Sequence, residues 1–219
     1  MEFFEIIKSL LTDIDGTLEL WVRDYGTWIY AILFLIVFVE TGLIVMPFLP
    51  GDSLLFTAGM LAAQGENQHF SIYVFVPLLI AAALLGDNVN YFVGRFFSDQ
   101  IKKRERILFF KREYITQTEA FFEKHGKQSI IIARYVPIVR TIAPFVAGAG
   151  NMRYRTYIVY CFIGAVIWVT SISLLGYFLG NVPIIKNNFE KVVLGIVFLS
   201  VMPILWQGVK AWRAKRAGK

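Results

Sequence analysis

The chain has 219 residues, of which 57% are hydrophobic and only 17% are charged, and its formal net charge is +6. Soluble domains average about 25% charged residues, so this composition, with a mean hydropathy of +0.58, excludes an ordinary soluble domain and indicates an integral membrane protein. The basic residues gather beside apolar segments, as membrane anchors do, which argues against a nucleic-acid-binding protein.

The first 25 residues place apolar side chains at the spacing of one helical face, but acidic residues interrupt them too often for a membrane span. We therefore expect an interfacial amphipathic helix over 1–25. A cleavable signal peptide is not expected, because the start lacks a basic region followed by an uninterrupted apolar one.

Two apolar stretches, at about 27–63 and 128–150, are broken by proline. Proline removes a backbone N–H and clashes with the preceding turn, so neither stretch can form one straight helix. Non-helical backbone is tolerated at membrane depth only where protein or a wet cavity surrounds it. We therefore expect two re-entrant helical hairpins that turn back inside the protein. Their turns are expected at Pro47, Pro50, Gly51, Pro137 and Pro144.

Other apolar runs are long enough to cross a bilayer; they lie at 71–94, 156–180 and about 190–209. The segment 95–127 contains nine Lys or Arg residues, and the tail 210–219 contains five and no acid. The positive-inside rule places both on the cytoplasmic side, whereas the side of the N-terminus stays open. The expected organisation is a membrane transport domain over 26–209, followed by a basic cytoplasmic tail over 210–219.

Short sequences recur between the two halves of this domain. Residues 56–59 (Phe-Thr-Ala-Gly) recur at 145–148 (Phe-Val-Ala-Gly), and residues 91–94 (Tyr-Phe-Val-Gly) recur at 177–180 (Tyr-Phe-Leu-Gly). Either match alone could arise by chance, but their shared order indicates a repeat. Because the spans 71–94 and 156–180 are expected to cross in opposite directions, the repeat would be inverted. Such repeats place a substrate site near the bilayer midplane.

Arg134 and Arg140 lie in the second broken stretch, where a charge costs at least ~2.5–3.5 kcal/mol on insertion scales. A guanidinium group never loses its charge in a protein and matches a phosphate group bidentately. The two arginines are therefore candidates for binding a lipid phosphate. Structural pairing with acidic residues of the other half is the alternative interpretation, and both roles can apply in different states.

Three acidic residues, Glu40, Asp52 and Asp87, lie in apolar surroundings. Removal from water favours the protonated form of a carboxyl group, whereas a neighbouring arginine favours the charged form. This opposition suits groups that bind and release a proton as a charged substrate comes and goes. Asp52 follows Pro50-Gly51 and could instead be a turn or cap residue, and Asp87 could be a structural partner of an arginine.

The combined motifs resemble the DedA family over nearly the whole chain. These motifs are Glu40-Thr41-Gly42, Pro47-Phe48-Leu49-Pro50-Gly51-Asp52-Ser53, Gly86-Asp87, Tyr91, Gly94-Arg95, Arg134-Tyr135-Val136-Pro137-Ile138-Val139-Arg140-Thr141 and Ala147-Gly148. The resemblance implies lipid transport in the bacterial inner membrane, driven by the proton motive force. Members are associated with undecaprenyl phosphate or with phospholipids, and eukaryotic relatives with lipid scrambling. The essential acidic pair of the family falls on Glu40 and Asp52, and its arginine pair falls on Arg134 and Arg140.

The expected fold is thus an all-α polytopic membrane protein with two re-entrant hairpins in an inverted repeat. The expected function is proton-motive-force-dependent transport of a lipid phosphate, first of all undecaprenyl phosphate. A phosphatidylethanolamine flippase or scramblase and an ion/proton antiporter are the alternatives. We expect no enzymatic activity, cofactor, metal or nucleic-acid partner; the transported lipid, the proton stoichiometry and the oligomeric state stay open.

The charge distribution gives a testable topology. In a Cys161→Ser background, single cysteines introduced as Glu105→Cys and Lys215→Cys should be shielded from an impermeant thiol reagent added to intact cells, because both segments are expected in the cytoplasm. Asn67→Cys, in a short segment without basic residues, should be labelled. Labelling at 105 from outside would invert the topology.

Overall fold

The computed structural model describes residues 18, 20–21, 24–42, 51–64, 70–97, 106–107, 110–150, 152–180 and 182 of the chain. The helices are α3 (Ile29–Gly42), α4 (Gly51–Gln64), α5 (Ile72–Phe96), α7 (Arg112–His125), α8 (Ser129–Ala133), α9 (Pro137–Ala149) and α10 (Tyr154–Gly180). The 3-10 turns η1 (Gly26–Trp28) and η2 (Gly126–Gln128) lead into α3 and α8. Two-residue strands, β1 (Arg106–Ile107) and β2 (Phe110–Lys111), pair antiparallel. The described part of the chain is therefore helical apart from this pair and short turns.

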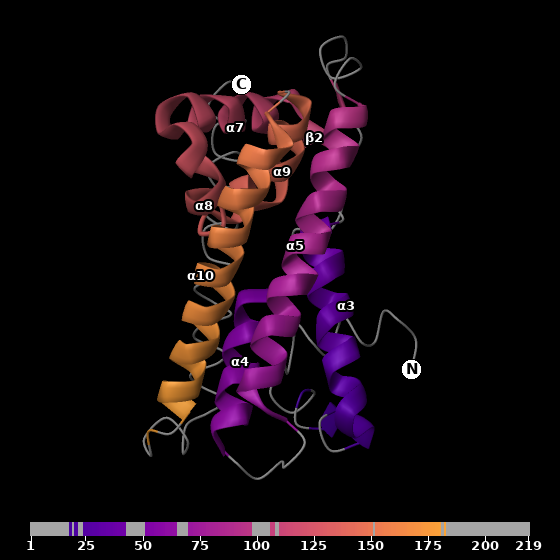
Figure 1. Ribbon diagram of the computed structural model, residues 1–219, viewed down its shortest axis with the longest axis vertical. Helices are drawn as coiled ribbons and strands as arrows, with labels where there is room; N and C mark the ends of the chain where they lie inside the picture. Colours follow the sequence, from indigo (N-terminus) through magenta and orange to yellow (C-terminus); the bar gives the residue numbers. More distant parts are fainter. Residues whose placement is uncertain are drawn as a thin grey trace, which may run out of the picture.

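The long helices α5 and α10 form the length of the molecule (Figure 1). They have 25 and 27 residues and are apolar enough to cross a membrane. At 1.5 Å per residue each reaches about 38–40 Å, more than the ~30 Å hydrocarbon core of a bilayer. Their outward faces carry exposed apolar side chains such as Phe92 and Phe178. The expected spans at 71–94 and 156–180 are thus present as apolar helices.

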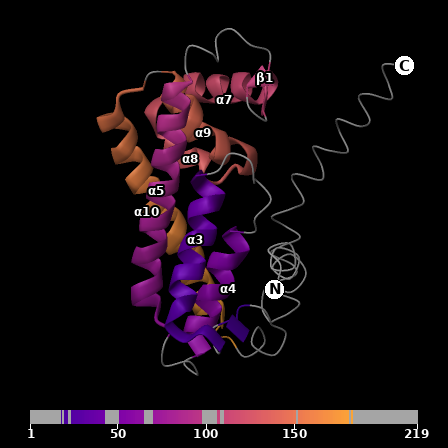
Figure 2. The same ribbon diagram turned by 90° about the vertical axis from the view of Figure 1, so that its right-hand side faces the viewer.

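The shorter helices divide between the two ends of this pair. Helices α3 and α4 lie along its lower half, and α7, α8 and α9 lie along its upper half (Figures 1 and 2). The backbone N–H of Ser71, just before α5, donates to the Tyr30 hydroxyl of α3 at 2.8 Å. The opposite end of α3 reaches the middle of α5, where Gly42 lies against the backbone of Gly86. Both halves have apolar cores of their own.

Glycines make the closest helix contacts, and they do so in the same way in both halves. A Cβ on Gly59 of α4 would overlap the backbone of Ser173 in α10, and a Cβ on Gly176 would overlap that of Phe56. In the other half, Gly148 of α9 meets the backbone of Tyr91 in α5, and Gly94 meets that of Phe145. The recurring segments 56–59 and 145–148 are therefore the places where short helices press against long ones.

These contacts correct one register predicted from the sequence. Gly94 contacts Phe145 as Gly176 contacts Phe56, so the spatial equivalent of Gly94 is Gly176. The tetrapeptide match had aligned Gly94 with Gly180, one helical turn further along. The physical reason is that the repeated feature is the site of close backbone approach, which requires glycine, and the neighbouring Tyr-Phe pairs do not share that position.

The structure places the expected turn residues Pro137 and Pro144 at different positions of α9. Pro137 begins α9, where its fixed backbone angle favours helix initiation and its missing N–H has no intrahelical role. Pro144 lies inside α9 rather than at a turn, so the carbonyl of Arg140 receives no helical hydrogen bond from that position. Gly51 begins α4. The expected turn residues Pro47 and Pro50 lie outside the described residues.

Helix α7 crosses the upper end of the molecule, where it packs against α8 and α9 (Figure 1). Its Phe122 contacts the apolar clusters around Phe145 and Tyr91. Helix α7 belongs to the segment 95–127, which the positive-inside rule predicts to be cytoplasmic. Most of the expected interfacial helix at 1–25, the expected span at about 190–209 and the tail 210–219 lie outside the described residues.

The glycine contacts make a direct stability prediction. Gly176→Ala should destabilise the protein by about 1–3 kcal/mol, because the added methyl group overlaps the Phe56 carbonyl in a packed interface. In detergent this should lower Tm by about 2–4 °C per kcal/mol. Gly150→Ala is the control, since Gly150 is exposed at the end of α9 and has a negative φ. Equal Tm values for the two variants would refute the tight contact between α4 and α10.

Candidate functional site

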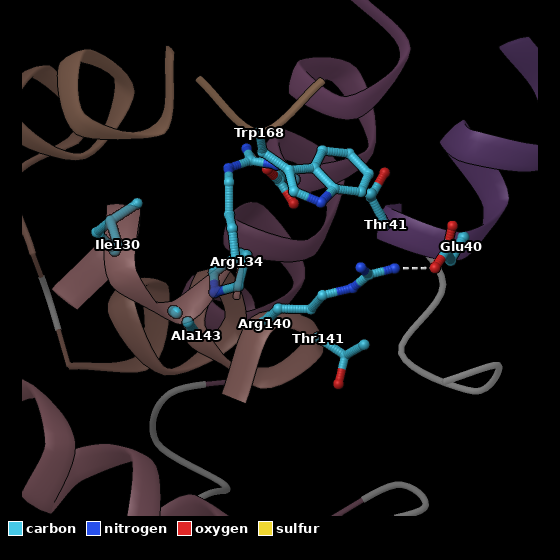
Figure 3. A pocket seen from close by; sticks show the side chains of 11 residues that line it. Glu40, Thr41, Ile130, Arg134, Arg140, Thr141, Ala143 and Trp168 are labelled. Carbon is cyan, nitrogen blue, oxygen red and sulfur yellow. Dashed lines mark hydrogen bonds and ion pairs between the residues drawn. The ribbon is translucent and has the colours of Figure 1, made fainter. Parts of the chain in front are cut away.

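Arg140 joins two acidic residues from the other half of the chain. Its Nη2 pairs with Glu40 Oε1 (Figure 3). Its Nη1 donates to Asp52 Oδ1 at 2.8 Å. Glu40 lies in the last turn of α3, Asp52 in the first turn of α4 and Arg140 in the first turn of α9. Glu40 is 2% exposed, whereas Asp52 is 37% exposed. One guanidinium group therefore holds three helix ends together.

Arg134 forms a second ion pair, more deeply buried than the first. Its Nη2 pairs with Asp87 Oδ2 in the middle of α5, and both side chains are less than 10% exposed. The same nitrogen approaches the Cys161 carbonyl at 3.3 Å, and the Tyr157 hydroxyl donates to the Asp87 carbonyl at 2.9 Å. Cys161 is buried beside this pair.

Trp168 of α10 connects the two ion pairs. Its Nε1–H donates to Asp52 Oδ1 at 2.9 Å, the same oxygen that accepts from Arg140. The guanidinium carbons of Arg134 and Arg140 lie 5.8 and 5.1 Å from the indole ring, within cation–π range. Sequence reasoning missed this residue, because a tryptophan in an apolar run resembles any packing residue. The sequence holds no signal for its role, because the nearest charged residues in the chain are Arg155 and Lys186.

Asn90 ties the two broken segments together at backbone level. Its Nδ2 donates to the carbonyl of Thr141 at 2.9 Å and approaches that of Thr41 at 3.4 Å. These threonines directly follow Arg140 and Glu40 in the sequence. Asn88, two residues earlier, instead bonds the Leu84 carbonyl and the Tyr154 hydroxyl. Asn90 therefore positions the residues that carry the charges.

The charges in this cluster do not cancel. If all are ionised, Glu40, Asp52 and Asp87 carry three negative charges and Arg134 and Arg140 carry two positive ones. Among the described residues, two buried atoms of these charged side chains have no hydrogen-bond partner, namely Glu40 Oε2 and Arg134 Nε. An excess of negative charge in a buried site favours uptake of a proton, and the proton can bind to a carboxylate oxygen that lacks a partner.

The cavity at the centre of the cluster is small. All of the charged side chains except Asp52 line it, together with Trp168 and the two threonines. Its volume of about 20 Å³ admits one water molecule but no phosphate group. The carboxylates accept from the arginine N–H groups that an anionic substrate would need. We call this arrangement closed, because both arginines pair with carboxylates of the protein itself.

No metal-binding geometry accompanies these acids. In the part of the chain that the structure describes, no three His, Cys, Asp or Glu side chains are grouped as ligands for an ion. Each carboxylate of the cluster pairs instead with an arginine. The arrangement can hold an anion, a proton or both.

The two ion pairs should differ in their importance for stability. Asp87→Asn leaves Arg134 with no carboxylate within the described residues, and an uncompensated buried charge costs about 3–5 kcal/mol. Asp52→Asn should cost less, because Arg140 retains Glu40. Adding Arg134→Gln to Asp87→Asn should recover part of the loss. A double-mutant cycle on unfolding in detergent measures the coupling; additive effects would mean that the pair does not exist.

Comparisons with known proteins agree with this membrane architecture. A family profile described as the VTT domain matches residues 49–178. Protein DedA of Escherichia coli K12 is 44% identical over 220 residues, covering 100% of both chains. The uncharacterized membrane protein Rv0364 of Mycobacterium tuberculosis H37Rv is 43% identical over 192 residues, covering 88% of this chain and 84% of its own.

A more distant relative is the inner membrane protein YqjA of Escherichia coli K12. It is 29% identical over 195 residues, covering 85% of this chain and 87% of its own. No solved structure matches the chain. The profile match includes Asp52, Asp87, Arg134 and Arg140, and begins nine residues after Glu40. The chain therefore is a membrane protein that belongs to the DedA family and contains its VTT domain.

Proposed function

We propose that this protein is a lipid transporter of the bacterial inner membrane, driven by the proton motive force, with undecaprenyl phosphate as its substrate. One observation carries the proposal: two arginines converge on one cavity between two apolar helices, and carboxylates from other helices occupy their donor groups. Membrane proteins rarely contain buried arginines without a functional reason. The choice of undecaprenyl phosphate rests on the family resemblance.

We propose that the pairs α3–α4 and α8–α9 are two re-entrant hairpins of an inverted repeat. The positions of the helix ends support this. Gly51 at the start of α4 lies against the Glu40 carboxylate near the end of α3. Arg134 directly follows α8, and Arg140 lies in the first turn of α9. The equivalent glycine contacts support the repeat. Helices α4 and α9 both begin at the charge cluster, and the positive end of a helix dipole favours an anion there.

The proposed substrate site is the donor set of Arg134 and Arg140. A phosphate group would take the place of the carboxylates, and the apolar tail would stay in the lipid. Because the cavity in the closed arrangement is too small for phosphate, the hairpins must separate before the headgroup enters. Separation would expose the site to one side of the membrane at a time. The lipid would move without a chemical change, so no phosphate should be released.

Protonation is the proposed trigger for that separation. A proton on Glu40 or Asp52 removes a negative charge that competes with the substrate for Arg140. Glu40 Oε2 has no partner in the part of the chain that the structure describes, and Asp52 is the more exposed acid. Asp87 would serve Arg134 in the same way. The excess negative charge of the cluster means that one proton restores its neutrality.

We also propose that the C-terminus lies in the cytoplasm, because the tail 210–219 is basic.

The arginines should not be replaceable by lysine. Arg134→Lys and Arg140→Lys keep the charge but lose the planar fork, and a hydrogen bond to a charged group contributes ~1.5–3 kcal/mol. Each variant should therefore transport at least about tenfold more slowly. The measurement is the fraction of undecaprenyl phosphate in sealed proteoliposomes that becomes accessible to an added phosphatase.

Arg95→Lys is the matched control for both arginine variants. Arg95 is exposed at the end of α5 and bonds the Tyr91 hydroxyl, outside the charge cluster. It should transport normally. Full activity of Arg134→Lys and Arg140→Lys at equal expression would reduce the arginines to generic positive charges and would count against a phosphate site.

Glu40→Gln tests proton coupling. Glutamine keeps an acceptor oxygen for Arg140 but cannot exchange a proton, so the variant should insert and fold normally. Transport should no longer respond to an imposed proton gradient. The rate is compared with and without an uncoupler in the same proteoliposomes. A variant that remains fully sensitive to the uncoupler would show that Glu40 is not the coupling residue.

A further inference from the structure

Asp52 Oδ1 marks a position where two different donors converge on one anionic oxygen. Arg140 Nη1 lies 2.8 Å from it and Trp168 Nε1 lies 2.9 Å from it. Asp52 is also the most exposed acid of the cluster, so it is the carboxylate that can leave most easily. When Asp52 leaves, a guanidinium N–H and an indole N–H remain directed at the same point. An incoming anionic oxygen finds both donors already in place.

The indole ring also sets the positions of both arginines. Its face lies within cation–π distance of Arg134 and of Arg140, and the side chain is 2% exposed. Figure 3 shows the ring beside the ends of both arginine side chains. An indole N–H is a donor only, so it favours an acceptor oxygen and never competes as an acceptor.

The glycine contacts that α5 and α10 have in common do not require a tryptophan at position 168. Gly94 and Gly176 are spatial equivalents, and eight residues before them lie Gly86 and Trp168. In α5, a Cβ on Gly86 would overlap the Thr41 side chain, so no side chain fits at this position. In α10, the equivalent position carries an indole directed into the charge cluster. The tryptophan is thus a feature of the site and not of the repeat.

We propose that Trp168 is a specificity-determining donor that makes the site selective for lipid phosphate monoesters over diesters. The inference rests on the proposed lipid-phosphate function. In the closed arrangement the arginines and the indole hold oxygens of three carboxylates, on Glu40, Asp52 and Asp87. A monoester has three terminal oxygens and up to two negative charges, which match three acceptor positions and two guanidinium groups. A diester has two terminal oxygens and one charge.

The test compares lipids with the same tail and different headgroups: a phosphate monoester, a phosphate diester or no phosphate. Binding of dioctanoyl phosphatidic acid, a monoester, and dioctanoyl phosphatidylglycerol, a diester, is measured by calorimetry in detergent at pH 8. Dioctanoylglycerol is the neutral control. Farnesyl phosphate and farnesol form a second pair, which shows whether the tail must be prenyl. The proteins are wild type, Trp168→Phe and Trp28→Phe; Trp28 is 72% exposed and lies outside the site.

Wild type should bind phosphatidic acid more tightly than phosphatidylglycerol. Trp168→Phe keeps an aromatic face but lacks the N–H, so monoester binding should weaken at least about tenfold while diester binding changes less than about twofold. Trp28→Phe should match wild type. An equal loss for both phospholipids would make Trp168 a packing residue, and no loss would exclude it as a donor; either result overturns the proposal.

Two further arms separate the possible failures. If Trp168→Phe unfolds, the benzothiophene isostere of tryptophan, which replaces the N–H by sulfur at nearly the same shape, is incorporated at 168 and judged by the same criteria. In an Asp52→Ala background, Trp168→Phe should still weaken monoester binding, because the donor acts on the ligand. No further loss there would mean that Trp168 acts only through Asp52. If the wild-type protein binds phosphatidic acid and farnesyl phosphate no more tightly than dioctanoylglycerol and farnesol, the lipid-phosphate function itself is refuted.

Discussion

A buried arginine needs an anionic partner, and this requirement connects nearly every helix that the structure describes. Arg140 of α9 holds Glu40 of α3 and Asp52 of α4, while Arg134, between α8 and α9, holds Asp87 of α5. Trp168 adds α10 to the same cluster. An unpaired charge in this place would cost several kcal/mol, so these helix ends cannot separate unless another ion replaces the lost partner. In the proposed function, a proton and a lipid phosphate would act on this same constraint.

The glycine contacts explain how the helix ends come together. Gly59 and Gly176 bring α4 against α10, and Gly94 and Gly148 bring α9 against α5. Each long helix thereby supports a short helix that begins at the charge cluster. The charge cluster thus lies between the α4–α10 contacts of one half and the α5–α9 contacts of the other. The apolar outer faces of α5 and α10 provide the surface that remains in lipid.

Sequence reasoning reached the charged residues of the site but not the geometry that joins them. An intramembrane charge is conspicuous, so Glu40, Asp52, Asp87, Arg134 and Arg140 could all be selected from one sequence. The pairing of Arg140 with two acids, and of Arg134 with Asp87, depends on tertiary contacts that no local pattern encodes. Trp168 and Asn90 were missed as site residues because a buried tryptophan and a helical asparagine have ordinary structural uses. The register of the second glycine match was one turn off, because short matches carry no information about which helix face makes the contact.

The proposed function requires Arg134 and Arg140 to hold the phosphate group of a lipid. This can be measured by native mass spectrometry of the protein, extracted gently from its own membrane. We expect a bound lipid whose mass and fragmentation show a terminal phosphate, and much lower occupancy in Arg140→Lys than in Arg95→Lys prepared in parallel. A bound lipid without phosphate, or equal occupancy in the two variants, would show that the arginines do not form a phosphate site.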